Sequence, residues 1–586
     1  MIKTRPCLTA LAALLLTWAP SASLAQDAEI EIAAQPLEAA IAELNAQTGL
    51  SILAPLELVE GRTSPGVAGQ MTPVEALTVL LSGTGLTIER LDETSVVVAE
   101  GAPNGQAEED GTVLAAPVLV QGELRTRSLQ ETTTSAVVYS GAELDSAPDF
   151  NIKDIIERTP NVTLNNGEQS FSLRGIDARG VSNDGGGLLV NVQVDGASLP
   201  NDDAIGFGPY SLWDLDQVEF LLGPQSTQQG RNALAGAVIF RSADPVHEFE
   251  AKGRAELGIR NTYGGAFAVN VPVIEDKVAF RISAEGRGTD GFVRAPNRGE
   301  ADYDFDEEAT FRGKILFEPN EDFSAIIGLT AARNRTGEDT IALGLFPDSR
   351  VNLSNTPAEE GTDNLITNLR MTYDFSDNLT LSSETVMLLN RYVRMEDIDG
   401  SPGLGTLDLG RDSNSFQQEL RLTFENERIA AVGGFFATYI EDEQAFDAIF
   451  DLGFLSGGPN TGIIITNAGE ENRDTFNFAF YGEVEIELPE IAEGLSLIAG
   501  GRYDRETLNN SAISSTTASA PLPFPDPTVS NTSTTFDAFL PKAGITYDWT
   551  ENLSTSFTWQ RGYRAGGTDV TLIVDPTNPV VAINEF

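Results

Sequence analysis

The sequence contains one cysteine and one histidine in 586 residues. Cys7 lies within residues 1–25, where a basic start and a short apolar run indicate a cleaved signal peptide. Cleavage removes this thiol, so the mature chain has no disulfide, thiolate metal site or cysteine nucleophile. His247 alone cannot build a Ser-His-Asp triad or a histidine metal cluster, and we expect it to be structural. These absences argue against an enzyme and against a bound cofactor or metal.

Long apolar runs are also missing. No stretch of about 18 apolar residues follows the signal segment, which excludes a helical membrane protein. A transmembrane β-barrel is still possible, because each of its strands needs only about 10 alternating residues. Positive charge is scarce, with 37 Lys+Arg against 87 Asp+Glu and a net charge of −50. Such a field repels nucleic acid, which is therefore not an expected partner.

Residues 28–100 contain one unit twice. Each copy starts at a proline (Pro36, Pro73), continues through an apolar helical pattern, and reaches a Thr-Gly-Leu stretch (Gly49, Gly85) before a short β-prone run. Proline suits the first helical position and glycine suits a helix end. Each copy therefore predicts a helix followed by a strand, and the two halves make a small α+β domain. This domain resembles the secretin-and-TonB N-terminal signalling domain.

Residues 101–122 form a linker rich in Gly, Ala, Pro, Asn and acidic residues, which predicts a mobile chain. At its end lies a β-prone island, Pro117-Val118-Leu119-Val120-Gln121. One interpretation is the first strand of the following domain. The other is an extended peptide that pairs with the edge of a partner's sheet. Its position resembles a TonB box, and Thr112-Val113-Leu114 is the alternative location.

Residues 123–245 carry short motifs in a fixed order, which include Leu173-Arg174-Gly175, Val194-Asp195-Gly196, Gly223-Pro224, Gly230-Arg231-Asn232 and Gly236. This order and spacing resemble the plug domain of TonB-dependent outer-membrane receptors. The resemblance assigns structural roles in the plug to Arg174, Gly175, Asp195, Gly196, Gly223, Pro224, Gly230, Arg231, Asn232 and Gly236. The glycines permit turns and close backbone approach. We expect Arg174 and Arg231 to pair with carboxylates of a polar barrel lumen.

Residues 246–586 alternate apolar and polar side chains throughout, as in Val278, Phe280 and Ile282 against Arg281 and Ser283. A soluble sandwich has the same period, so the turns decide between the two folds. Short polar turns recur near residues 275–276, 320–322, 376–378, 426–427, 489–490 and 550–552. Long polar loops, at 289–305, 335–361 and 506–534, lie between them. Short turns at one end and long loops at the other are typical of outer-membrane barrels.

The predicted fold is an all-β transmembrane barrel with an internal plug, preceded by the small α+β periplasmic domain. Residues 539–544 and 561–567 resemble the barrel half of the same receptor family. The turn spacing predicts about thirteen strands after residue 246, whereas plugged transporters of this type close with about 22. We therefore expect the barrel in 246–586 to be incomplete at the C-terminus.

The resemblance implies an outer-membrane importer with its N-terminal domain in the periplasm. A plug must close the barrel, and the outer membrane has no ATP. Work would therefore arrive through the box from the TonB–ExbB–ExbD complex of the inner membrane. The implied ligand is a ferric siderophore, so iron enters only as part of the cargo. The N-terminal domain implies contact with a periplasmic anti-sigma regulator. Uptake of a carbohydrate or cobalamin, or a receptor that mainly signals, are the alternatives.

Overall fold

The computed structural model divides into two compact units, Met1–Ala116 and Pro117–Phe586, and each is described by itself. It describes residues 28–32, 35–48, 51–53, 59, 62–81, 84, 86–90 and 95–100 of the first unit, and residues 118–147, 152–165, 170–179, 187–338, 350–398, 403–455, 460–522, 524, 527–550, 553–564, 568–573 and 580–585 of the second. The predicted signal peptide and the alternative box location at 112–114 lie outside the described residues. Among those residues, no helix has the length and apolar character needed to cross a membrane.

The first unit packs two helices, α1 (Leu37–Thr48) and α3 (Pro73–Leu81), around one core. Leu37, Ala40 and Leu44 are fully buried at helical spacing, as the sequence pattern predicts. The strands form three small sheets: β1 (Ala28–Ile32) with β5 (Val67–Met71), β2 (Gln35–Pro36) with β4 (Thr63–Ser64), and β3 (Ser51–Leu53), β7 (Ser95–Glu100) and β6 (Leu86–Arg90) in that order. Pro36 differs from expectation, because it ends β2 and α1 starts one residue later.

The second unit begins with a mixed α/β body, here called the plug. Its main sheet has the order β10 (Ser135–Ser140), β16 (Leu215–Leu222), β17 (Gly236–Ser242), β14 (Val190–Val194) and β15 (Ala197–Ser198). A three-stranded sheet of β11 (Val162–Asn165), β12 (Ser170–Leu173) and β13 (Ile176–Asp177) and a pair of β8 (Leu119–Val120) with β9 (Arg127–Ser128) accompany it. Short helices connect the strands: α4 (Gly141–Ser146), α5 (Ile152–Arg158), α6 (Asp202–Gly206) and α7 (Ser226–Gln229).

Two of the predicted glycine motifs are tight hairpin turns in the plug. Leu173 pairs with Ile176 across Arg174 and Gly175, and Val194 pairs with Ala197 across Asp195 and Gly196. All four turn residues have positive φ, at 51° and 80° in the first turn and 48° and 83° in the second. Two central residues with positive φ match the twist of the flanking strands, and glycine adopts this conformation at little cost.

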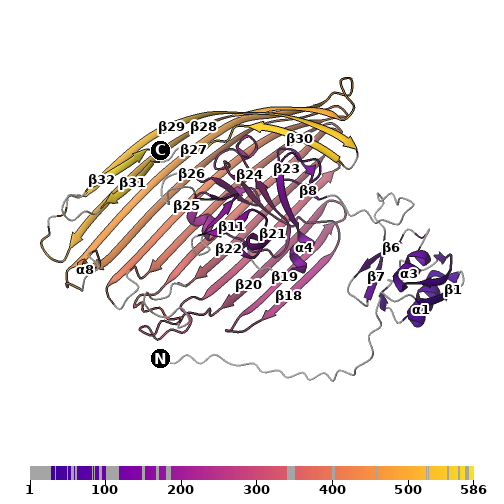
Figure 1. The fold of residues 1–586 in the computed structure, drawn as a ribbon, viewed down its shortest axis with the longest axis horizontal. Helices are drawn as coiled ribbons and strands as arrows, with labels where there is room; N and C mark the ends of the chain where they lie inside the picture. Colours follow the sequence, from indigo (N-terminus) through magenta and orange to yellow (C-terminus); the bar gives the residue numbers. More distant parts are fainter. Residues whose placement is uncertain are drawn as a thin grey trace. The chain divides into compact units, whose positions relative to one another are not determined.

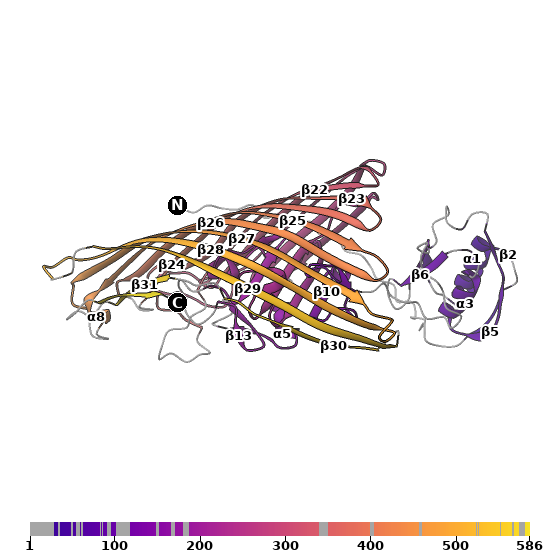
Figure 2. The same cartoon turned by 90° about the horizontal axis from the view of Figure 1, so that it is seen from above.

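The rest of the second unit is a curved antiparallel sheet of thirteen strands in sequence order, here called the wall. Figures 1 and 2 show the plug on its concave side. The strands are β18 (Glu250–Leu257), β19 (Tyr263–Ile274), β20 (Val278–Thr289), β21 (Asp306–Asn320), β22 (Phe323–Thr336), β23 (Glu359–Ser376), β24 (Leu379–Glu396), β25 (Gly405–Glu425), β26 (Ile429–Asp451), β27 (Ile464–Glu487), β28 (Leu495–Ala518), β29 (Thr528–Thr550) and β30 (Leu553–Gln560). Helix α8 (Leu452–Leu455) follows β26, and β31 (Thr568–Ile573) pairs with β32 (Val580–Glu585).

The wall has one polar and one apolar face. On β25, Ser415 and Gln417 are buried on the plug side, whereas Phe416, Leu420 and Leu422 are 43–52% exposed on the other. Successive side chains of a strand point to opposite faces, so the sequence alternation becomes this division directly. An apolar outer face over a polar interior is the arrangement that a strand wall in lipid requires.

The predicted short turns all fall between wall strands, and the sheet has the predicted number of strands. The predicted loop at 506–534 is wrong. Strand β28 continues to Ala518 and β29 starts at Thr528, so the connection spans only 519–527. The Ser, Thr and Asn residues at the facing ends of β28 and β29 do not alternate with apolar residues. They still pair in register, from Thr507–Thr535 to Ser514–Thr528. Backbone hydrogen bonds therefore extend the hairpin beyond the apolar part of the wall.

Candidate functional site

The predicted box segment is docked on the plug. Val118 and Leu119 are 43% and 40% exposed, but Val120 is fully buried against Leu221 and Ile239. Pro117 lies outside the described residues. The segment pairs through β8 with β9, which makes it the first strand of the following domain in this state. That placement leaves the second interpretation, a partner-binding peptide, as a prediction.

Among the described strands, β8 pairs with β9 alone. Leu129 donates its backbone N–H to the carbonyl of Val118 at 2.7 Å, and Leu119 lies opposite Ser128. In an antiparallel pair this pattern makes Leu119 and Ser128 a non-hydrogen-bonded pair. The N–H of Leu119 therefore points away from β9.

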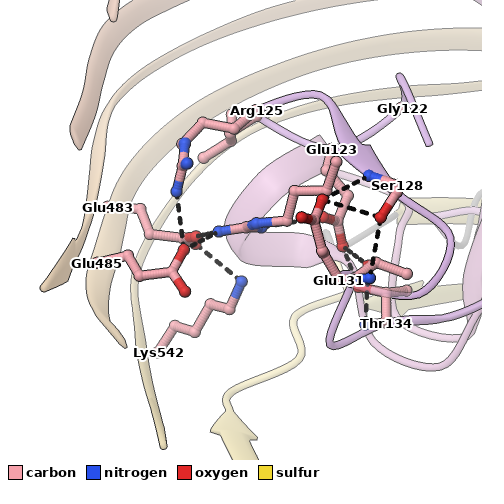
Figure 3. A network of polar contacts seen from close by, with 12 residues as sticks. Gly122, Glu123, Arg125, Ser128, Glu131, Thr134, Glu483, Glu485 and Lys542 are labelled. Atoms are coloured by element: carbon pink, nitrogen blue, oxygen red, sulfur yellow. Dashed lines mark hydrogen bonds and ion pairs between the residues drawn. The ribbon is translucent and has the colours of Figure 1, made fainter. Parts of the chain in front are cut away.

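A buried ion network joins the start of the plug, at Glu123 and Arg125, to Glu483, Glu485 and Lys542 of the wall (Figure 3). Arg127 lies at the centre of this network. The Arg127 guanidinium donates to Glu123 at 3.0 Å, to Glu483 at 3.2 Å and to Glu485 at 2.9 Å. Lys542 on β29 donates to Glu483 at 2.8 Å, and both of these side chains are 2% exposed. Burial alone lowers the pKa of Arg127, but the three carboxylates outweigh burial and raise the pKa. The guanidinium is therefore a charged anchor held by strong hydrogen bonds.

The residues around Arg127 hold the same segment in place. Arg125 donates to Glu485 at 2.8 Å. The other oxygen of Glu123 accepts hydrogen bonds from the hydroxyls of Thr132 and Thr134. The chain just after the box is thus bound to the wall by Arg125 and Arg127. Arg127 also binds Glu123, which in turn is hydrogen-bonded to the plug.

Asp195, at the second hairpin turn, ties the plug to wall strands β21 and β22. Its carboxylate accepts hydrogen bonds from the backbone N–H and hydroxyl of Ser242 and from Thr330, at 2.8–3.2 Å. Lys314 lies 3.6 Å away. Burial by itself raises the pKa of Asp195, but Lys314, Arg312 and the Ser242 hydrogen bonds outweigh it and lower the pKa to about 2. The carboxylate is therefore ionised and structural.

The two predicted arginines differ in their surroundings. Arg231 lies 3.0 Å from Glu506, which is 1% exposed, so the expected pairing with a carboxylate of the wall is present. Arg174 is exposed at its hairpin turn, and no carboxylate in the described part of the chain pairs with it. The pairing expected for Arg174 therefore stays a prediction. Arg174 has a φ of 51° in its turn, and its guanidinium lies beside Gly223 of the plug.

Several of the motif glycines lie where the backbone passes so close to neighbouring groups that a side chain would not fit. A Cβ at Gly196 would lie 2.4 Å from Glu384, one at Gly230 2.5 Å from Arg502, and one at Gly236 2.2 Å from the carbonyl of Leu221. Gly223 has a φ of 107° and Asn232 a φ of 63°. The carbonyl of Pro224 accepts a hydrogen bond from Gln560 of β30. Gly196, Gly230 and Pro224 therefore lie against the wall, whereas Gly236 packs within the plug, and their structural role stays a prediction.

A cavity of about 120 Å³ lies between the plug and the wall, directly behind the box segment. Its lining includes Gln121, Gly122, Arg241, Arg370, Glu384 and Arg421. Because its lining is mostly polar and charged, this cavity favours water over an apolar group. No group of three or more His, Cys, Asp or Glu side chains placed to hold a metal occurs within the described ranges.

Sequence reasoning did not single out Arg127, Glu483 or Lys542. Two arginines within three residues, Arg125 and Arg127, are unusual in a chain with so few cations, and this could have indicated an ion-pair site. Its partners were not identifiable, because Glu483 lies 356 residues away from Arg127.

A plug packed against the polar face of a curved sheet of long antiparallel strands is the architecture of plugged outer-membrane barrels. Comparison with known families agrees. Residues 292–580 match the TonB dependent receptor-like beta-barrel, residues 128–237 the TonB-dependent receptor plug domain, and residues 50–100 the secretin and TonB N terminus short domain. The chain belongs to the TonB-dependent receptor family. It is an outer-membrane protein whose N-terminal domain is periplasmic.

Curated relatives include the ferric-pyoverdine BN7/BN8 receptor of Pseudomonas putida, 28% identical over 46% of this chain and 34% of that protein. The ferripyoverdine receptor of Pseudomonas aeruginosa is 27% identical over 43% of this chain and 32% of its own length. The chain thus spans about a third of the length of the curated relatives it matches.

Solved structures have the same fold at low sequence identity. The ferric yersiniabactin uptake receptor FyuA from Yersinia pestis superposes with a TM-score of 0.63 at 16% identity, over 77% of this chain and 67% of that one. The ferripyoverdine receptor of Pseudomonas aeruginosa, solved with ferripyoverdine, has a TM-score of 0.54 at 16% identity, over 94% of this chain and 71% of that one.

Proposed function

We propose that the protein is an energised importer of a ferric siderophore, and not an enzyme. The observation that carries the proposal is the docked segment 118–122, which leads directly into the ion network that fixes the plug to the wall. A force applied to this segment would act directly on the plug, because no other part of the chain lies between the segment and the ion network. The iron is cargo, and the energising partner is the TonB–ExbB–ExbD complex.

Relatives named as a ferric-pyoverdine receptor and a ferrioxamine B receptor support a ferric siderophore as ligand. The test is uptake of radiolabelled iron as ferric pyoverdine and as ferrioxamine B, in iron-limited cells with and without the gene. We expect deletion to abolish uptake of at least one complex and complementation to restore it. Equal uptake by both strains across a broad siderophore panel rejects the substrate class.

A second role is signalling to a periplasmic anti-sigma regulator. The match of residues 50–100 to the secretin and TonB N terminus short domain supports it. The first unit also has its own core, which includes Leu37, Leu44, Leu77 and Leu80. A domain with its own core can transmit a signal without forming part of the transport path.

Deletion of residues 28–100 is expected to leave uptake within about twofold of wild type and to abolish ligand-induced transcription. The reason is that these residues contribute nothing to the described contacts between plug and wall. A reporter gene and radiolabelled iron uptake are measured in the same cells, after surface abundance is matched. Loss of uptake at normal abundance contradicts this separation of roles.

A further inference from the structure

The outward face of the wall changes from apolar to charged near the long-loop end of its middle strands. On β25, Phe416 is exposed on this face, and Asp412 lies four residues closer to the loop on the same face. On β24, Met387 and Leu389 are followed in the same way by Arg391. Outer-membrane barrels carry their long loops on the extracellular side. The change therefore marks the level at which the hydrocarbon of the outer leaflet meets its headgroups.

A row of charged side chains crosses five neighbouring strands at this level, β22 to β26 (Figure 1). Its members pair in register from strand to strand, in the order Arg333, Asp363, Arg391, Asp412 and Glu443. Cross-strand partners share one face of a sheet, so the whole row lies on the outward face. Leu365 and Leu389 pair with each other two residues nearer the short turns, directly below the row.

A groove of about 380 Å³ runs along the outward face at this row. Its lining includes Asp363, Leu365, Leu389, Arg391, Asp412 and Glu443. The two leucines lie on the side of the short turns, and the charged residues lie on the side of the long loops. The groove thus has an apolar part in the hydrocarbon layer and a charged part at the headgroups. A lipid molecule has the same division of polarity.

Exposed cations are rare on the wall. Of the lysines and arginines in its described strands, only Arg333, Arg391 and Arg505 have side chains more than 40% exposed, at 64%, 68% and 48%. All three lie on the outward face, next to the loop-side end of its apolar part. Arginines at this level meet the anionic headgroups of the membrane.

The guanidinium groups of Arg333 and Arg391 have donors to offer. Nε of Arg333 lies 3.8 Å from Asp363 and Nε of Arg391 lies 3.9 Å from Asp412, and both distances are longer than a hydrogen bond. In the described part of the chain, neither guanidinium donates a hydrogen bond. Asp363 already accepts one from Arg335 at 2.6 Å. The carboxylates therefore attract the two guanidinium groups without using their donors.

One phosphate fits between the two arginines. Neighbouring strands are about 4.8 Å apart, so the Cα atoms of Arg333 and Arg391, on the strands either side of β23, are separated by roughly 10 Å. Two long side chains converge over this distance. Guanidinium groups bind phosphate oxygens in pairs of parallel hydrogen bonds, which makes arginine well suited to a phosphate headgroup.

We propose that this groove binds a lipid of the outer leaflet through its phosphate. The phosphate lies on the guanidinium groups of Arg391 and Arg333, and an acyl chain lies along Leu389 and Leu365. The groove is on the face that points away from the plug, so the lipid has no part in the path of the transported ligand. The proposal goes beyond the proposed function and does not depend on it.

The test is binding of lipid A, a phosphorylated glycolipid, to the purified receptor in detergent, with bound lipid counted by native mass spectrometry. Wild type is expected to bind this lipid at least tenfold more tightly than the same lipid without its phosphates. Arg391→Gln is expected to weaken binding of the phosphorylated form at least fivefold, because the neutral amide loses the charge and the paired donors. The double variant with Arg333→Gln is expected to lose more.

Arg428→Gln is the matched control. Arg428 is also exposed, at 54%, but it lies in the short turn between β25 and β26, at the other end of the strands. We expect its affinity for lipid A to stay within about twofold of wild type. Heat-modifiable mobility on gels shows that each variant is folded. Equal weakening in Arg391→Gln and Arg428→Gln overturns the site.

Three further measurements identify what the groove recognises. Inorganic phosphate, at the concentration of the lipid, is expected to leave the lipid bound, and displacement by it shows a site for free anions and overturns the lipid as occupant. Equal affinity for lipid A with and without phosphates overturns the role of the arginines. Leu389→Asn is expected to weaken binding several-fold, whereas unchanged affinity in this variant overturns the placement of the acyl chain.

Discussion

Leu119→Pro is expected to reduce iron uptake at least tenfold while ligand binding to whole cells stays unchanged. Proline lacks the N–H that a pairing strand requires. The Leu119 N–H points away from β9, so the substitution removes no bond of the β8–β9 pair. Uptake of radiolabelled ferric siderophore at 37 °C and binding on ice separate the two effects.

Leu119→Ala is the matched control for this experiment. It shortens a side chain that is 40% exposed and keeps the backbone donor. We expect uptake within about twofold of wild type. If the alanine and proline variants lose uptake equally, side-chain contact and not strand addition explains the loss. If neither loses uptake, the box lies elsewhere, with 112–114 as the next region to test.

Glu483→Gln is expected to destabilise the receptor by about 3–5 kcal/mol, the usual cost of removing one partner of a buried ion pair. The change leaves Lys542 without its 2.8 Å carboxylate and deprives Arg127 of one of three. The measurement is the temperature at which the folded band is lost on gels of heated outer membranes. We expect this temperature to fall clearly below that of wild type.

Two further variants test whether burial of the Glu483 ion pair sets the cost of its loss. Arg428→Gln breaks an ion pair with Glu490 whose side chains are 54% and 65% exposed, so we expect this temperature to stay close to that of wild type. Glu483→Gln combined with Lys542→Met removes the stranded charge and is expected to recover part of the stability. A drop of equal size for the exposed and the buried pair shows that burial does not set the cost.

The features that could be predicted from the sequence are those that a local residue pattern determines. The apolar alternation of 246–586 became two faces of one sheet, and each short polar turn became a strand connection. The Asp195-Gly196 pair became a hairpin turn because two positive φ values suit that pair of residues. Such features depend on neighbours within a few residues, so one sequence is enough to find them.

Contacts between distant segments were not predictable in the same way. Arg127 meets Glu483 only because the chain folds a plug against the wall, and nothing near either residue indicates the other. Composition also misled at 506–534, where Ser, Thr and Asn suggested a loop but the backbone ladder continues. The pairing expected for Arg174 followed from its charge alone, and charge does not indicate where a partner lies in the fold.

The length of the central strands has a consequence for the outer mouth. Strands β27 and β28 have 24 residues each. At about 3.3 Å per residue they run for roughly 80 Å, and a tilt of about 45° leaves them far taller than a hydrocarbon layer of about 30 Å. The excess rises as a stiff collar above the lipid headgroups. Its amides stand in water yet are ladder-bonded, so hydrogen–deuterium exchange there is expected to be as slow as within the bilayer, with fast exchange confined to the hairpin tips.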